Sequence, residues 1–90
     1  KIMKVKIKAV YDFGPSVADR YTVYFNIKGS RFEFYEARAM SDNPYHPQGF
    51  GQWTEGALGE HNGKEIKFSE LPEPCQKLVN TDIEFITAQN

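Results

Sequence analysis

The sequence has a single cysteine, Cys75, in 90 residues. One thiol cannot form a disulfide within the chain, which favours a reducing compartment, so we expect a cytoplasmic protein. No apolar run reaches the roughly 18 residues that cross a membrane. The N-terminal sequence KIMKVKIKAV alternates lysine with apolar residues, whereas a signal peptide has a continuous apolar stretch. These absences predict a soluble chain without a membrane partner.

The chain also lacks an excess of either charge. It has 11 Lys and Arg residues against 12 Asp and Glu residues, and its net charge is −1 at pH 7. Domains dedicated to nucleic acid usually carry a clear basic excess, so this balance disfavours nucleic acid as a partner. The Walker and Rossmann glycine patterns are absent as well. We therefore predict no nucleotide or other cofactor.

The chain does contain many apolar and aromatic residues, which make up 40% and 14% of it, beside 26% charged residues. This balance is typical of a folded globular domain. Large aromatic side chains also bury much apolar area in a small core. A length of 90 residues matches one domain, and no repeat or linker divides it. We predict a single domain over residues 1–90.

Residues 2–13 alternate between apolar and polar side chains, which predicts a half-buried strand. The apolar members of one face are Met3, Val5, Ile7, Ala9 and Tyr11. The opposite face carries Lys4, Lys6 and Lys8. Lysine rows of this kind protect an exposed sheet edge from unwanted pairing. Beside exposed aromatic rings, the same row is a feature that can bind single-stranded nucleic acid.

Two further strands are predicted at 21–27 and 31–40, joined as a hairpin through the glycine-containing turn 28–30. In the second of these strands, apolar residues occupy both faces. One face has Phe32 and Phe34, and the other has Tyr35, Ala37 and Ala39. Either a bulge shifts the register there, or both faces of the strand are covered. We favour coverage by a helix on one face and by the following segment on the other.

The C-terminal part begins with an Asn-Gly turn signal at 62–63 and a short strand over 64–68. Ser69 is a candidate N-cap for a C-terminal helix. The apolar residues that follow have helical spacing, with Asp82 as the one polar member of their face. The β-branched residues in 83–87 leave helix or strand open for that segment.

Between these elements lies the stretch 41–63, which has no Lys or Arg but both histidines, the only tryptophan and five of the seven glycines. Linkers are poor in aromatic residues, so this composition indicates an ordered loop packed by its own side chains. The predicted fold is therefore α+β. It has a small antiparallel sheet of three or four strands, one C-terminal helix and a long ordered loop over about 41–63.

The same loop supplies the candidate binding residues. Its amide, imidazole and carboxylate groups stand beside aromatic rings, a surface that suits a protein segment or a small polar ligand better than a phosphate. The candidates are Asp42, Tyr45, His46, Gln48, Phe50, Gln52 and Trp53. The sequence DNP at 42–44 also predicts an Asx turn. Such polar residues often satisfy the backbone of a loop, so a purely structural loop is the alternative.

The sequence has no recognisable catalytic or metal-binding motif. His46 and His61 lack the short paired spacing of zinc ligands, so we predict no metal site. The serines and the cysteine lack a nucleophile elbow or a catalytic-cysteine context, which favours a protein that is not an enzyme.

The leading hypothesis is a non-catalytic interaction module that uses the 41–63 loop. Binding of single-stranded nucleic acid through the N-terminal lysine face and exposed aromatics is one alternative. A small hydrolase that uses Asp42 and His46 as an acid–base pair is another. An open sheet edge would also allow two copies to pair as a homodimer.

The phrase MSDNPYHPQGFGQ at 40–52 resembles one found in small uncharacterised proteins of gut bacteria and their phages. Those proteins are also similar to this chain at DRYTVYF (19–25) and at GKEIKFSELP (63–72). The resemblance covers most of 19–78 and implies a single-domain bacterial or phage protein of unknown role. It implies no catalytic residue.

Overall fold

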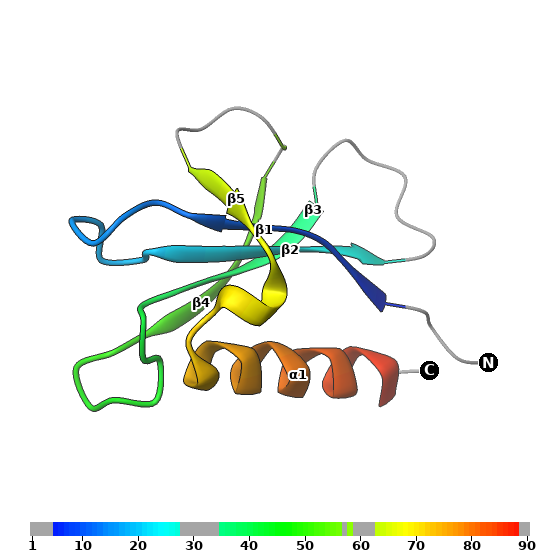
Figure 1. Cartoon of the computed structure of the whole chain (residues 1–90). Coiled ribbons are helices and arrows are strands. Elements are labelled where there is room, and N and C mark those ends of the chain that lie inside the picture. Colours follow the sequence, from blue (N-terminus) through cyan, green and yellow to red (C-terminus); the bar gives the residue numbers. More distant parts are fainter. Residues whose placement is uncertain (1–4, 28–34, 57, 59–62, 89–90) are drawn as a thin grey trace.

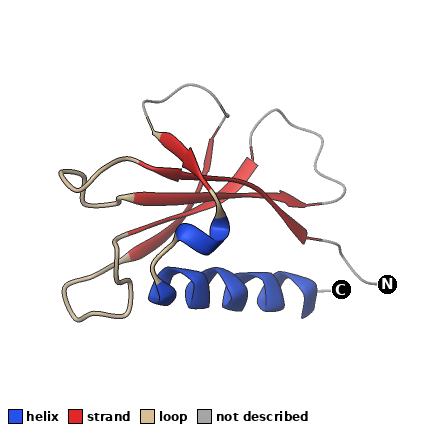
Figure 2. Cartoon of the chain, viewed as in Figure 1, coloured by secondary structure: helices blue, strands red, loops and turns tan. Residues whose placement is uncertain are grey.

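The computed structural model describes residues 5–27, 35–56, 58 and 63–88. Within them lie the strands β1 (Val5–Asp12), β2 (Tyr21–Ile27), β3 (Tyr35–Met40), β4 (Gly51–Gly56) and β5 (Lys64–Ile66), the 3-10 helix η1 (Phe68–Glu70) and the helix α1 (Glu73–Ala88). The strands form one antiparallel sheet of five, in the order β4-β3-β2-β1-β5. Helix α1 runs along one face of this sheet (Figures 1 and 2). The α+β class is confirmed, with more strands than the three or four predicted.

The additional strand, β4, lies inside the stretch predicted to be a loop. It pairs with β3 from Met40↔Gly51 to Tyr35↔Gly56, so the two strands form a hairpin. The prediction of a single loop over 41–63 is therefore wrong. The error has a physical cause: β4 is an edge strand that is exposed over most of its length. Such a strand shows no alternation of apolar and polar residues, and its extended form depends on pairing with β3.

The hairpin turn, residues 41–50, extends past the N-terminal end of α1 (Figure 1). The Cys75 thiol donates a hydrogen bond to the Ser41 carbonyl oxygen at 3.3 Å. The Lys77 ammonium lies 5.5 Å from the centre of the Tyr45 ring. These contacts place the turn on the helix side of the sheet, whereas we expected it to cover the opposite face.

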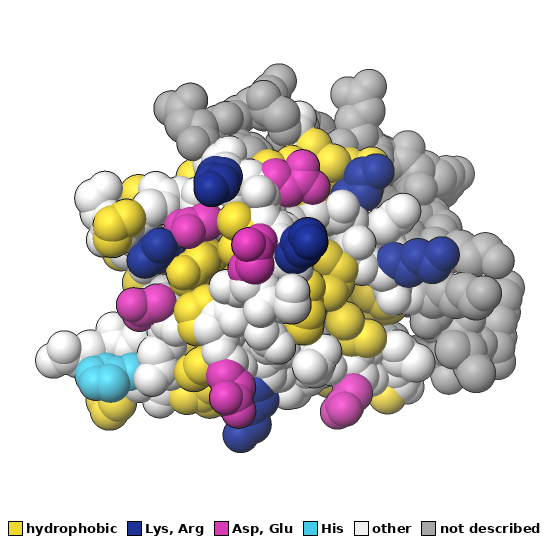
Figure 3. Space-filling view, viewed as in Figure 1, with side chains coloured by type: hydrophobic (Ala, Val, Ile, Leu, Met, Phe, Trp, Pro, Cys, Tyr) yellow, Lys and Arg dark blue, Asp and Glu magenta, His cyan; other side chains and the backbone are white. Residues whose placement is uncertain are grey.

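The surface carries both signs of charge. On the face shown in Figure 3, Lys and Arg side chains stand among Asp and Glu side chains, with hydrophobic groups between them. No helix in the described part of the chain has the length and apolar character needed to cross a lipid bilayer.

Strand β1 contains a bulge in its middle. Its register with β2 runs through Ile7↔Phe25 and resumes at Ala9↔Tyr24, so Lys8 is an extra residue. An extra residue reverses the alternation of side chains along the rest of a strand, because successive side chains point to opposite faces.

The bulge decides which residues of β1 enter the core. Val10, only 2% exposed, packs in the core cluster, and Val5 and Ile7 pack against it. Ala9 and Tyr11 therefore lie on the other face, although the period of two predicted them beside Val5 and Ile7. That prediction is wrong because periodicity alone does not reveal an inserted residue.

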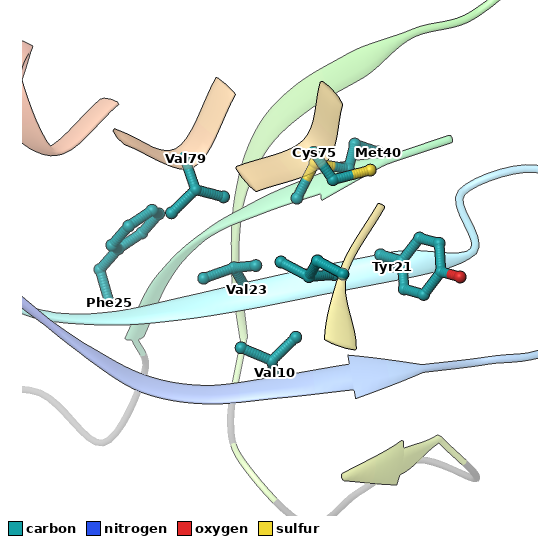
Figure 4. Packing of buried hydrophobic residues seen from close by; sticks show 8 residues of the cluster. Val10, Tyr21, Val23, Phe25, Met40, Cys75 and Val79 are labelled. Carbon is teal, nitrogen blue, oxygen red and sulfur yellow. The ribbon is translucent and has the colours of Figure 1, made fainter. Parts of the chain in front are cut away.

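The main core lies between α1 and the sheet (Figure 4). Its members come from strands β1, β2 and β3, from the connection between η1 and α1, and from α1 itself, and they form one cluster. They are Val10, Tyr21, Val23, Phe25, Met40, Leu71, Cys75 and Val79. The helical spacing of Cys75 and Val79 was visible in the sequence, and these two residues lie on the face of α1 that packs on the sheet. Leu71 precedes α1 and enters the core from the end of η1.

The opposite face of the sheet is buried as well. Its buried side chains are Ala9, Thr22, Tyr24, Ala37 and Ala39. In Figure 1, β4 runs away from α1, whereas β5 leads back toward η1 and α1. Three of the five buried residues on the face opposite to α1 are alanines. Both faces of β3 are thus covered as predicted, but not by the 41–50 turn.

Helix α1 begins after a proline. The Pro72 carbonyl oxygen accepts bonds from the backbone N–H groups of Cys75 and Gln76, so the helix starts at Glu73. Ser69 lies within η1, and the prediction that it caps α1 is wrong. The helix continues through 83–87, which settles that segment as helix.

Three predicted features lie outside the described residues: the 28–30 turn, the 31–34 part of the third strand and Asn62 of the Asn-Gly turn.

The close approach of the backbone in the hairpin turn yields a first prediction. A Cβ at Gly49 would overlap the Asn43 carbonyl oxygen. We expect Gly49→Ala to lower the free energy of unfolding by about 2 kcal/mol, since the turn has to open to relieve the overlap. Gly56→Ala is the matched control, because its new Cβ would meet only ordinary contacts at 3.6 Å with Tyr24. Urea denaturation measures the free energy of unfolding of both variants. An equal decrease in the two would contradict the close approach of Gly49 to the Asn43 carbonyl.

The buried thiol yields a second prediction. Burial raises the pKa of the Cys75 thiol from 9.0 to about 11, and the charge of Asp42 adds to the rise. Because the folded protein holds this proton more tightly than the unfolded chain, the resulting stability is complete below pH 9. It is lost as the pH rises toward 11.

We expect the free energy of unfolding of the wild type to fall more steeply between pH 9 and 11 than that of Cys75→Ala. Burial also raises the pKa of Tyr21 and Tyr24, but both tyrosines remain in the variant. The difference between the two curves therefore isolates the thiol. Parallel curves would show that Cys75 does not ionise differently on folding.

Candidate functional site

The hairpin turn is built from two consecutive tight turns. The Asn43 side-chain oxygen accepts a hydrogen bond from the Tyr45 backbone N–H at 3.2 Å, which confirms the predicted Asx turn. The His46 N–H then donates to the Asn43 carbonyl, and the Gly49 N–H to the His46 carbonyl. The turn is therefore held by its own backbone.

Polar side chains of the turn also serve that backbone. The Ser41 hydroxyl accepts from the Phe50 N–H at 3.0 Å and lies 3.2 Å from the Phe50 carbonyl oxygen, to which it can donate. The His46 Nδ1 accepts from the Gln48 N–H at 3.0 Å, which assigns the ring proton of the neutral form to Nε2. These bonds support the structural interpretation of the turn.

The geometry gives little support to a hydrolase. A general base needs a free lone pair, and the His46 Nδ1 lone pair is engaged by Gln48. Among the contacts of the described residues, no hydrogen bond or ion pair joins Asp42 to His46. Both residues do border one shallow hollow of about 250 Å³.

The structure does not gather the seven candidate residues into one site. Asp42, His46 and Gln48 line the hollow just described. Tyr45, 53% exposed, lines a different one with Lys77. Gln52 and Trp53 lie on β4, where neighbouring residues point to opposite faces. Phe50, beside Ser41, is also exposed.

A further hollow lies beside Trp53. It is a cleft of about 370 Å³ between β3, β4 and the C-terminal half of α1, lined by Glu36, Arg38, Trp53, Asp82, Phe85 and Ile86. Trp53 is 41% exposed and Phe85 is 66% exposed. Two large aromatic rings are thus exposed to water at one cleft, and neighbouring exposed apolar groups are a feature of interaction surfaces.

The Trp53 ring is held rigidly. It stacks on Phe25, with ring centres 5.4 Å apart and planes at 17°. The Arg38 guanidinium lies 5.3 Å from its centre. Arg38 in turn donates two hydrogen bonds to Asp82, Nε to Oδ2 at 2.9 Å and Nη2 to Oδ1 at 2.6 Å. The ring is thus fixed before any partner arrives, which lowers the entropy cost of binding.

Among the described strands, β4 is outermost on its side of the sheet, and none of them pairs with its outer edge. The Ser41 N–H donates to the Phe50 carbonyl, and hydrogen-bonded pairs alternate along an antiparallel ladder. The backbone groups of Gln52 and Thr54 therefore face β3. Those of Trp53 and Glu55 point outward, where another strand could pair with them.

This edge also carries a local negative charge. Glu36 and Glu55 are directly opposite each other in the β3–β4 register, and both are exposed. No ion pair to either glutamate occurs among the described residues. Arg38, which lines the same cleft, is already neutralised by Asp82.

Phe85 and Asp82 were not among the predicted site residues. Phe85 follows Leu78 by seven residues and therefore lies at the edge of the apolar face of α1. This i, i+7 spacing is the signal that could have drawn attention to it. The bond from Asp82 to Arg38 spans 44 residues of sequence, so no local pattern reveals it.

Within the described residues, Lys6 and Lys8 of β1 have no exposed aromatic residue beside them. Lys8 lies 5.9 Å from the centre of the Tyr35 ring, which is only partly exposed. The exposed large hydrophobic residues of the described chain lie elsewhere and are Val17, Tyr45, Phe50, Trp53 and Phe85. Basic and acidic groups are also mixed on the face in Figure 3. These features do not favour binding of single-stranded nucleic acid.

In the part of the chain that the structure describes, no three His, Cys, Asp or Glu side chains cluster as they would around a metal ion. His61 lies outside that part.

Comparison with known proteins identifies no relative: no family model, no curated protein and no solved structure matches this chain.

The Arg38–Asp82 pair yields a third prediction. We expect Asp82→Asn to lower the free energy of unfolding by about 3 kcal/mol, because it leaves the Arg38 charge without its partner in a largely buried position. The double variant Arg38→Met with Asp82→Asn should lose less than the sum of the two single variants. Urea denaturation of the four proteins measures this coupling.

The more exposed pair of Arg20 and Asp12 is the control, and Arg20→Met should cause a smaller loss. If the losses at Arg38 and Asp82 are additive, the two side chains do not act as a pair.

Proposed function

We propose that this protein is a non-catalytic interaction module that binds an extended segment of another protein along the outer edge of β4. The segment adds a strand to the sheet, and one of its apolar side chains enters the cleft between Trp53 and Phe85. Strand addition of this kind draws affinity from main-chain hydrogen bonds and specificity from side-chain pockets.

One observation carries this proposal: an open strand edge lies directly beside a cleft with two exposed aromatic rings. The outward backbone groups at Trp53 and Glu55 supply the main-chain donors and acceptors. The cleft supplies an apolar recess of about 370 Å³. Trp53 supplies a pre-ordered ring of the residue type that most often dominates binding energy.

The location of the proposed surface differs from the leading sequence hypothesis in one respect. Both proposed surfaces include Trp53. The sequence hypothesis added the polar side chains of the 41–50 turn, whereas the surface proposed here adds Phe85 of α1 instead. The inward hydrogen bonds of Ser41, Asn43 and His46 support this shift, since side chains engaged with their own backbone offer less to a ligand.

A fourth prediction tests this function. A library of random peptides, displayed on phage and selected on the immobilised protein, should yield clones that bind through β4. Glu55→Pro should abolish their binding, because proline removes an outward N–H without breaking a bond to β3. Glu55→Gln, which keeps the N–H, separates this effect from loss of the side chain.

Phe85→Ser should weaken the same clones at least tenfold, since it removes one wall of the cleft. Tyr45→Ser is the matched control, because it removes an equally accessible aromatic ring from the 41–50 turn. Far-UV circular dichroism establishes that each variant is folded. Clones that lose binding to Tyr45→Ser but not to Phe85→Ser would place the site on the turn instead. A dimer that Glu55→Pro converts to a monomer would assign the edge to a second copy.

A further inference from the structure

We infer, on the basis of the strand-addition function proposed above, that the partner segment carries an apolar side chain and a Lys or Arg side chain two residues apart. The apolar side chain lies in the cleft beside Trp53. The cation lies at the level of the Glu36 and Glu55 carboxylates.

The spacing follows from the geometry of β4. Trp53 and Glu55 are two residues apart, so their side chains point to the same face of the sheet. That face is the helix side, because Trp53 stacks on the core residue Phe25. A strand added beside β4 has the same repeat of two residues. Its side chain beside Trp53 and its side chain beside Glu55 are therefore also two residues apart.

The charge follows from the β3–β4 register. Glu36 and Glu55 stand directly opposite each other, and like charges in this arrangement repel. The nearest described cation on that face, Arg38, is engaged twice by Asp82. A Lys or Arg from the partner would be attracted to both carboxylates, whereas an acidic residue there would face two like charges.

No described strand of this chain offers the pattern to a second copy. In β1, Lys8 and Val10 are two residues apart, but β1 lies between β2 and β5 and Val10 is buried. In the outermost strand β5, Lys64 and Ile66 have the same spacing, but Ile66 packs against the core cluster. The observations therefore favour a segment of a different protein over a second copy of this chain.

Three synthetic peptides with capped ends test the inference. The first is Thr-Lys-Thr-Leu-Thr-Lys-Thr, which places a Lys beside Glu55 in either strand direction. The second has Glu in place of both Lys residues, and the third has both Lys residues directly next to Leu, so that they point to the face opposite to the Leu side chain. Trp53 is the only tryptophan of the protein, so its fluorescence reports binding at the proposed site without a label. We expect the first peptide to bind about tenfold more tightly than either of the others at low salt, with the preference shrinking as salt is added.

A double variant, Glu36→Lys with Glu55→Lys, should reverse the preference in favour of the Glu peptide. The variant Glu73→Lys, which alters an acidic residue near the opposite end of α1, should leave it unchanged. Equal affinity for the Lys and Glu peptides would overturn the charge assignment. Equal affinity for the first and third peptides would overturn the spacing.

The outcomes separate this inference from the function on which it rests. If the selected phage clones bind through β4 but lack the basic residue, strand addition stands and the partner class is wrong. If no clone depends on β4, the proposed function fails first. Clones that bind through β4 and carry the apolar–basic pair support both.

Discussion

The ion pair between Arg38 and Asp82 joins the sheet to the helix at the cleft, and the rest of the candidate surface depends on it. Asp82 lies on the face of α1 that packs on the sheet, together with Cys75 and Val79, and its two bonds to Arg38 join that face to β3. Phe85 borders the same cleft as Trp53. The Arg38 guanidinium also lies over the Trp53 ring, which stacks on Phe25. The ion pair therefore links the two elements that carry the aromatic walls. Such a pair contributes more to specificity of packing than to net stability, since its desolvation offsets much of its attraction.

The small size of the chain sets a second constraint: the five short strands have to bury enough apolar area to stabilise the fold. The bulge at Lys8 turns Val10 toward α1 and Ala9 toward the other face, so β1 contributes to both layers. The second layer, on the face opposite to α1, is made largely of small residues, among them Ala37 and Ala39. Burial on both faces leaves the outer edge of β4 as an open part of the sheet.

The 41–50 turn shows how a composition that looks functional can be structural. Its prolines, glycines and polar residues build two tight turns, and Ser41, Asn43 and His46 satisfy backbone groups. The turn also accepts the bond from the Cys75 thiol, which ties it to α1. Its value to the candidate site is therefore indirect: it fixes the hairpin on which Trp53 is presented.

The sequence alone determined the features that depend on local repeats. The alternation at 21–27 matches β2 residue for residue, and the helical spacing around Cys75 and Val79 identified the face of α1 that packs on the sheet. It also singled out Trp53 as a candidate, and the structure places this residue at the cleft. The α+β class followed from these patterns, because periods of two and of about 3.6 residues report which face of an element is buried.

Tertiary structure decided the features that the periodicity of apolar residues does not reveal. The bulge at Lys8 inserts a residue without changing composition, and β4 has no apolar alternation because it is an exposed edge that depends on β3 for its form. The Arg38–Asp82 pair and the meeting of Trp53 with Phe85 join residues far apart in the chain. Contacts of that range are set by how the elements pack against one another, and packing is a property of the whole chain that local sequence does not encode.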